Sequence, residues 1–165
     1  MRHVFPFLFC AGPLMADPAA NLDWRFISDR VMGGLSDGRA VLDDGALHLS
    51  GKVSTQNNGG FIQARTAVTG FDADTKGVAV TVRGDGQTYY IHLRTSGTQR
   101  PWHFYQASFE TTGRWQEVRL QWSDFAPSSN ILAKIPAPVT VRSIALVAYG
   151  RDHAADVYLS DVGPY

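Results

Sequence analysis

The chain lacks most of the features that would assign it to a class of protein directly. Its 165 residues include one cysteine, Cys10, so no disulfide can form within the chain. Fifteen basic and fifteen acidic residues give a formal net charge of +0, and no run of like charges occurs. Because binding to a nucleic-acid backbone needs a clustered basic surface, we expect no nucleic-acid partner.

Motifs for metals and cofactors are also missing. The five histidines are not closely spaced, and neither G-x-G-x-x-G nor G-x-x-x-x-G-K-[ST] occurs, so we expect no metal and no cofactor. Asp152, Asp156 and Asp161 could hold calcium together with loop carbonyls, but solvated carboxylates at strand ends are the simpler interpretation.

The N-terminal segment is typical of a short secretory signal. Met1-Arg2-His3 carries positive charge, residues 4–15 are mostly apolar, and Ala16-Asp17 begins a polar stretch. We therefore predict a signal peptide over residues 1–16 and a periplasmic location, with a cytoplasmic leader as the alternative. The apolar run is shorter than the roughly 20 residues that span a bilayer, so we expect no membrane segment in the mature chain. Lipid modification of Cys10 would require a small residue where Phe9 stands.

Residues 17–165 predict one all-β domain. Short runs of alternating apolar and polar residues are separated by Gly, Asp and Pro, over residues 24–28, 46–53, 60–66, 77–83, 88–95, 102–110, 115–122, 141–150 and 155–161. Strands at this spacing favour a jelly-roll β-sandwich. Asp85-Gly86 predicts a hairpin between the strands on either side of it.

Two glycine-rich segments predict tight turns. The first runs Asp29-Arg30-Val31-Met32-Gly33-Gly34-Leu35-Ser36, and the second Asn57-Asn58-Gly59-Gly60-Phe61. Paired glycines beside residues that bond to their own backbone predict turns that pass through positive φ, so we expect backbone geometry and not ligand chemistry to require Gly33, Gly34, Gly59 and Gly60. The two asparagines are expected to hold a left-handed turn with Phe61 anchored in the core, and direct ligand contact by their amides is the alternative. Residues 34–38 match G-x-S-x-G, but a strand-like pattern follows Ser36 where a hydrolase needs a helix.

These turns resemble a known family when they are taken with other segments of the chain. The further segments are Trp24, Gly84-Asp85-Gly86-Gln87-Thr88-Tyr89-Tyr90, Arg100-Pro101-Trp102, Trp115 and Asp124-Phe125. From Trp24 to the C-terminus the chain is similar to the complex I intermediate-associated protein 30 family, named for an assembly factor of respiratory NADH:ubiquinone oxidoreductase. The resemblance implies a jelly-roll β-sandwich similar to galactose-binding domains, and a chaperone-like, non-catalytic protein that binds a protein partner or assembly intermediate. A carbohydrate-binding module is the alternative, because a fold does not determine a function, and an enzyme using Ser36 or His92 is a third class.

One predicted surface combines aromatic and polar side chains. Tyr90, His92 and Arg94 share one face of their strand, and Trp102 to Tyr105 follow on the next. If the two strands pair, this face also holds either His103 and Tyr105 or Trp102 and Phe104. Such a mixture is expected of a binding surface, whereas simple cross-strand packing is the alternative. The residues predicted to bind are Tyr90, His92, Arg94, Trp102, His103 and Tyr105.

Overall fold

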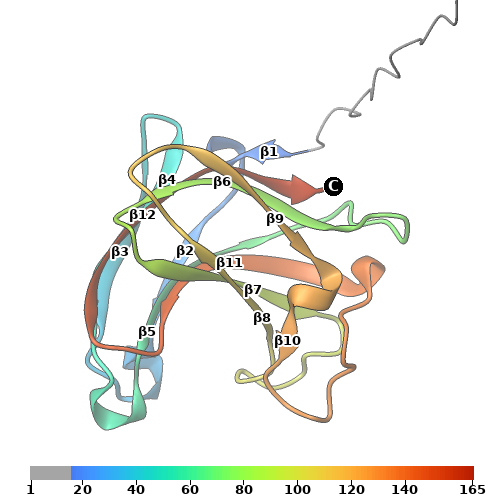
Figure 1. The fold of residues 1–165 in the computed structure, drawn as a ribbon. Coiled ribbons are helices and arrows are strands. Elements are labelled where there is room, and N and C mark those ends of the chain that lie inside the picture. Colours follow the sequence, from blue (N-terminus) through green and yellow to red (C-terminus); the bar gives the residue numbers. More distant parts are fainter. Residues whose placement is uncertain (1–15) are drawn as a thin grey trace, which may run out of the picture.

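The computed structural model describes residues 16–165, which form two antiparallel sheets packed face to face (Figure 1). Apart from Ala16, the predicted signal peptide lies outside the described residues, as does Cys10. The first sheet has the order β3 (Asp37–Asp43), β4 (Ala46–Val53), β12 (His153–Pro164), β6 (Gly77–Gly84) and β9 (Gln116–Gln121), and β1 (Asp17–Pro18) also pairs with β12. The second has the order β10 (Ala126–Pro127), β8 (Tyr105–Glu110), β7 (Thr88–Thr95), β11 (Val141–Tyr149), β5 (Phe61–Ala67) and β2 (Arg25–Ser28).

Helical structure in the described part of the chain is limited to single 3₁₀ turns. They are η1 (Ala19–Asn21), η2 (Asp29–Met32), η3 (Gln56–Asn58), η4 (Trp122–Asp124) and η5 (Pro138–Thr140). None of these turns has the length and apolar character needed to cross a membrane. The all-β class predicted from the sequence is confirmed.

The core lies between the two sheets and follows the alternation of the strands. In β7, Tyr89, Ile91 and Leu93 are 0% exposed. Burying each of these side chains contributes about 2 kcal/mol. β11 lies between β7 and β5, and its outward residues Ala145 and Val147 are buried as well. Side chains therefore cover both faces of this central strand, as its unbroken apolar run from Ile144 to Ala148 indicates.

Two local predictions were wrong. Asp85-Gly86 does not close a hairpin, because β6 belongs to the first sheet and β7 to the second, so this turn carries the chain across the sandwich. The strand expected over residues 102–110 begins only at Tyr105. Residues 102–104 instead belong to a loop whose backbone carbonyls point at Arg94.

Three strands were not among those predicted, the two-residue strands β1 and β10 and the longer β3. β3 pairs along its whole length with β4 through the two-residue turn Asp44-Gly45, whose φ angles are 50° and 80°. Positive φ at both positions is the geometry that matches the twist of a two-residue hairpin. Most of β3 is exposed or half-buried, so its sequence carries a weak apolar alternation.

Candidate functional site

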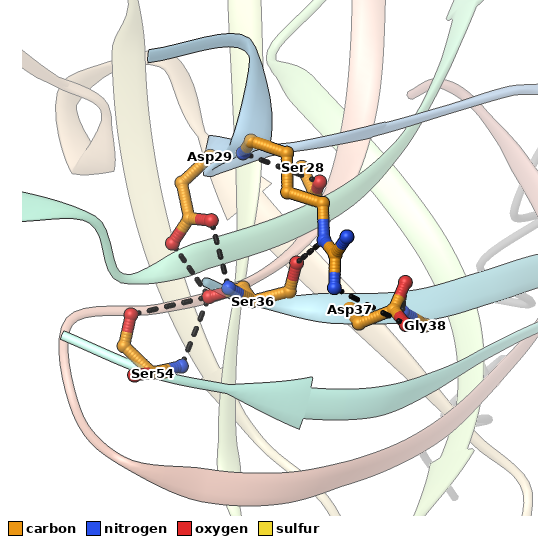
Figure 2. Close-up of polar contacts among 7 residues, drawn as sticks. Ser28, Asp29, Ser36, Asp37, Gly38 and Ser54 are labelled. Carbon is orange, nitrogen blue, oxygen red and sulfur yellow. Dashed lines mark hydrogen bonds and ion pairs between the residues drawn. The ribbon is translucent and has the colours of Figure 1, made fainter. Parts of the chain in front are cut away.

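A buried carboxylate joins the two glycine-rich turns, and Figure 2 shows its bonds to Ser36 and the link from Ser36 to Ser54. Asp29 is 0% exposed, and its Oδ1 accepts a hydrogen bond from the Ser36 amide at 2.9 Å. Its Oδ2 accepts from the Ser36 hydroxyl at 2.5 Å, from the Gly60 amide at 2.6 Å and from the Phe61 amide at 3.4 Å. The Ser36 hydroxyl in turn accepts from the Ser54 amide at 2.9 Å. One charged group thus connects residues 29–36 with residues 54–61.

The hydrogen bonds decide the charge of Asp29. Burial raises the pKa of its carboxyl group, but the bonds from Ser36, Gly60 and Phe61 outweigh burial and bring the pKa below its usual value. The group is therefore an anion at neutral pH. Its donors take the place of the water that it lost on folding.

The four glycines of the turns are required for two different reasons. Gly33 and Gly60 have φ angles of 86° and 131°, as predicted. At Gly34 and Gly59 the expectation that backbone geometry requires the glycine was wrong, because neither has a positive φ angle. A Cβ atom at either of these positions would instead overlap the Asp29 carboxylate. Gly34 and Gly59 are thus explained by the space that a distant side chain occupies.

The other residues of the two turns divide into confirmed and corrected predictions. Asn57 and Asn58 both adopt the left-handed conformation, with φ angles of 57° and 58°, as predicted. Phe61 does not anchor the turn in the core, because Ile62 takes the inward position of β5 and Phe61 lies half-buried on the outward face. Met32 is 63% exposed. The Ser36 hydroxyl is buried, so a substrate cannot reach it in this structure.

The outward face of the second sheet carries the predicted aromatic and polar surface. β7 and β8 pair with His92 opposite Gln106, so Phe104 shares the face of His92. The rings of these two residues stack with centroids 4.2 Å apart. Tyr149 of β11 packs edge-on against His92 and against Tyr90, at 5.8 Å in each case. Of the two registers left open by the sequence, the one with Trp102 and Phe104 is correct.

Three of the predicted binding residues have other roles. Tyr105 was wrongly placed on the surface, because its partner is the inward residue Leu93, and its hydroxyl donates to the Ala133 carbonyl at 2.9 Å. His103 is 6% exposed within the loop. The guanidinium of Arg94 donates to four backbone carbonyls of this loop, those of Thr98, Arg100, Pro101 and His103. Arg94 and His103 therefore shape the loop from inside.

The loop and the sheet enclose an open pocket of about 400 Å³. Its lining consists of Trp102, Phe104, Gln106, Ala126, Pro127, Ser128 and Tyr149. Trp102 is 63% exposed beside this pocket, while Ser128 fixes the loop by donating to the Trp102 carbonyl at 2.8 Å. Tyr149 and Gln106 were not predicted as site residues. The alternation of β11 and β8 places both side chains on the outward face. This placement points to the pocket only when it is known that β11 and β8 lie on either side of β7.

His92 is neutral in this setting. Burial, aided by the positive charge of Arg65, lowers the pKa of its imidazole to about 4 in spite of the raising effect of the hydrogen bond with Gln106. Its Nε2 lies 2.7 Å from the Gln106 Oε1. At neutral pH the ring therefore serves to pack and to orient the Gln106 amide.

No group of three or more potential metal ligands converges within residues 16–165. The carboxylates considered for calcium are engaged separately. Asp152 accepts hydrogen bonds from Thr55, and Asp156 pairs with His48 at 2.7 Å. The calcium alternative is therefore not supported by the arrangement of these side chains.

Comparison with known proteins gives a family model and several similar folds. The model described as Complex I intermediate-associated protein 30 (CIA30) matches residues 14–154. The family 11 carbohydrate-binding module of the cellulosomal cellulase Lic26A-Cel5E of Clostridium thermocellum is 11% identical, with a TM-score of 0.67 over 92% of each chain. A family 11 module from Clostridium thermocellum in complex with a β-1,3-1,4-mixed-linked tetrasaccharide is 11% identical, with a TM-score of 0.63 over 86% of this chain and 87% of that one. A family 4 carbohydrate-binding module is 16% identical, with a TM-score of 0.54 over 86% of each chain. No curated protein matches the sequence. At these identities the structures show the fold alone, which is a jelly-roll β-sandwich of the galactose-binding-like type.

The steric role of the Asp29 carboxylate can be tested on the glycines around it. We expect Gly34→Ala and Gly59→Ala each to lower the free energy of unfolding by about 1–3 kcal/mol, since the added Cβ overlaps a buried charged group. Gly33→Ala should cost about 1 kcal/mol through its positive φ alone. Gly113→Ala is the control, because Gly113 has open space around it and should change stability by less than about 0.5 kcal/mol. Urea unfolding measures all four, and a Gly34→Ala variant as stable as the control would contradict the packing described here.

The charge of Asp29 predicts an acid limit to stability. The pKa of Asp29 in the folded state is below the unfolded value of about 3.9. Its contribution to the free energy of unfolding is therefore complete above about pH 4 and is lost as pH falls through the folded pKa. Asp29→Asn should lower the free energy of unfolding by about 3 kcal/mol at pH 7. The asparagine side chain cannot accept all four hydrogen bonds, and its own N–H groups would face backbone N–H donors. The difference between wild type and variant should shrink as pH falls below 4. Urea unfolding at pH 7 and at acidic pH checks both values, and a constant difference would rule out the buried anion.

The neutral state of His92 predicts a second pH effect with a different window. Because its folded pKa of about 4 is below the unfolded value of 6.5, the unfolded chain binds a proton first and stability falls as pH decreases from 6.5 to 4. His92→Phe keeps a ring against Phe104 and does not titrate. Relative to this variant, the wild type should lose on the order of 2–3 kcal/mol across that window. If the free energies of unfolding of wild type and His92→Phe changed in parallel with pH, His92 would have the same pKa in the folded and unfolded states. That result would contradict the prediction.

Proposed function

The chain belongs to the complex I intermediate-associated protein 30 family, and we propose that it is a non-catalytic, chaperone-like binding protein that holds a protein partner against the outward face of its second sheet. The observation that carries this proposal is the open pocket beside Trp102. A large aromatic side chain that is 63% exposed next to a pocket lined by Phe104 and Tyr149 is typical of a contact surface.

The pocket is built in advance of any binding. Arg94 holds the loop from inside through four carbonyls, and Ser128 accepts a hydrogen bond from the Phe104 amide at 2.9 Å while donating to the Trp102 carbonyl. Trp102 is therefore exposed on an ordered segment. A partner that binds there loses less conformational freedom to the ordering of the loop, which favours affinity.

The residues considered for catalysis support a binding role instead. Ser36 is 0% exposed with its hydroxyl donating to Asp29, and His92 is 7% exposed beneath Phe104 and Tyr149. Neither side chain is placed to meet a substrate. The export predicted from residues 1–16 stays a prediction, and it would place the partner outside the cytoplasm.

A carbohydrate ligand is the second candidate for the same pocket. The observation that favours it is the pairing of the exposed Trp102 ring with the polar groups of Gln106 and Ser128, since sugars bind by stacking on rings and by hydrogen bonds. The structure of a similar fold contains a β-1,3-1,4-mixed-linked tetrasaccharide. Binding to a mixed-linked β-glucan would separate this candidate from the first.

The proposal predicts that partner capture depends on the pocket. Trp102→Ala and Tyr149→Ala should each weaken capture of a protein from an extract of the native host by about tenfold or more, because central aromatic contacts of an interface contribute about 2 kcal/mol or more. Both side chains are partly exposed, so the melting temperature should change little. Quantitative pull-down with the tagged chain and thermal unfolding measure the two effects.

The matched control is Trp115→Ala, which removes a tryptophan that is 42% exposed and packs against Tyr158 of the first sheet. This variant should capture the partner as the wild type does. Equal capture by all three variants would exclude the pocket as the contact surface. Trp102-dependent retention on an immobilised mixed-linked β-glucan, with no protein captured, would favour the carbohydrate candidate.

A further inference from the structure

Positive charge gathers on the part of the second sheet's outward face that β2, β5, β7 and β11 form, away from Glu110 on the outward face of β8. On this face, β2, β5 and β7 carry Arg25, Arg65 and Arg94, and the outward residues of these strands and of β11 include no Asp or Glu. Arg25 lies directly opposite Arg65 in the antiparallel pair of β2 and β5. Like charges at directly opposed positions destabilise a sheet, so this arrangement costs stability in the free protein.

Arg65 is a half-buried cation with unused donors. The hydrogen bond found for its side chain runs from Nη2 to the Gln63 Oε1 at 3.3 Å, and its Nε is buried without a partner. None of the ion pairs among residues 16–165 involves Arg25, Arg65 or Arg94. Burial lowers the pKa of Arg65, and the charges of Arg94 and Arg25 lower it further. The Nε is closed to solvent, so an acceptor from outside can reach this guanidinium only at its terminal nitrogens.

The three arginines differ in what they can offer a ligand. Arg94 uses both of its terminal nitrogens on loop carbonyls, so it contributes positive charge alone. Arg65 keeps its Nη1 group for an acceptor, and Arg25 is exposed beside it. The planar guanidinium fork matches the two oxygens of a carboxylate.

The cations share their surface with the aromatic pocket. The charge of Arg65 acts on His92, and His92 contacts both Phe104 and Tyr149 of the pocket lining. From β8 to β5 the strand order is β8-β7-β11-β5, which is about 14 Å at about 4.8 Å between neighbouring strands. An extended peptide covers this distance in about four to five residues.

We propose that Arg65 and Arg25 bind a carboxylate of the partner, and that the partner presents it in an acidic segment that crosses the sheet. This inference rests on the proposed function and specifies the chemistry of the bound segment. A Glu or Asp side chain reaches the Arg65 fork, while an apolar side chain about four to five residues away lies in the pocket beside Trp102. The acidic group supplies an acceptor for the Arg65 Nη1 and relieves the repulsion between the two arginines.

The test uses a fluorescein-labelled peptide of ten glutamates as the probe, with a peptide of ten glutamines as its neutral counterpart. Fluorescence anisotropy at low ionic strength should show binding of the glutamate peptide alone, and added salt should weaken it through screening. Arg65→Gln and Arg25→Gln should each weaken binding by about tenfold or more, since each removes a charge-assisted hydrogen bond. Arg114→Gln removes the same charge from an exposed site outside the second sheet and should bind as the wild type does.

Thermal unfolding of the same variants separates a binding defect from a folding defect. Arg25→Gln should melt at the wild-type temperature or above it, because it removes the repulsion with Arg65. Equal affinity of Arg25→Gln, Arg65→Gln and Arg114→Gln for the glutamate peptide, or no binding by the wild type, would overturn the inference. Arg65-dependent binding of an oligogalacturonate in place of the peptide would overturn it too, because the carboxylate would then belong to a sugar.

The pull-down with Arg25→Gln distinguishes failure of this inference from failure of the proposed function. Partner capture that depends on Trp102 but not on Arg25 would leave the pocket as the contact surface and refute the acidic segment. Capture that depends on neither residue would refute both. Capture that depends on both supports the two together.

Discussion

The structure depends on one buried anion. The Asp29 carboxylate has no access to water and accepts four hydrogen bonds from Ser36, Gly60 and Phe61. A charge in this position is tolerated only while its donors are in place, because an unpaired buried charge costs several kcal/mol. The residues around it are therefore interdependent: Gly34 and Gly59 leave the room that the carboxylate fills, and the Ser36 hydroxyl links it to Ser54. Two loops far apart in the sequence become one rigid end of the sandwich.

A second charged group, the guanidinium of Arg94, fixes a loop through backbone carbonyls. Arg94 donates to four carbonyls of the loop before β8, just as Asp29 accepts from amides. This loop presents Trp102 at the edge of the pocket, and its order comes from Arg94 rather than from a hydrophobic core of its own. Charges that are satisfied by backbone thus shape both loops, whereas Arg65 and Arg25 pair with no carboxylate among residues 16–165. That contrast separates the groups that hold the fold from the groups proposed to bind.

The strands and the aromatic face could be predicted from the sequence. The pairing register of the strands and the sheet that each strand joins could not. Alternation in β7 identified Tyr89, Ile91 and Leu93 as inward, because period-two patterning is a local property. The pairing register decides that Phe104 and not Tyr105 shares the face of His92, and no local pattern encodes it. The turn residues of Asp85-Gly86 are equally suited to a hairpin and to a crossing between sheets. Gly34, Gly59 and Arg65 depend on side chains distant in sequence, so local propensity could not explain the glycines or select Arg65 as a site residue.

Hydrogen exchange of individual backbone amides, measured on the free protein and on the complex with its captured partner, tests most directly whether the turns are framework and the sheet face is the contact. The amides of Ser36 and Gly60 donate to the Asp29 carboxylate, so they should exchange only through global unfolding in both samples. New protection in the complex should fall on the loop over residues 96–104 and on the pocket. New protection confined to residues 29–36 and 56–60, with rapid exchange there in the free protein, would contradict the account and make the glycine-rich turns the recognition site.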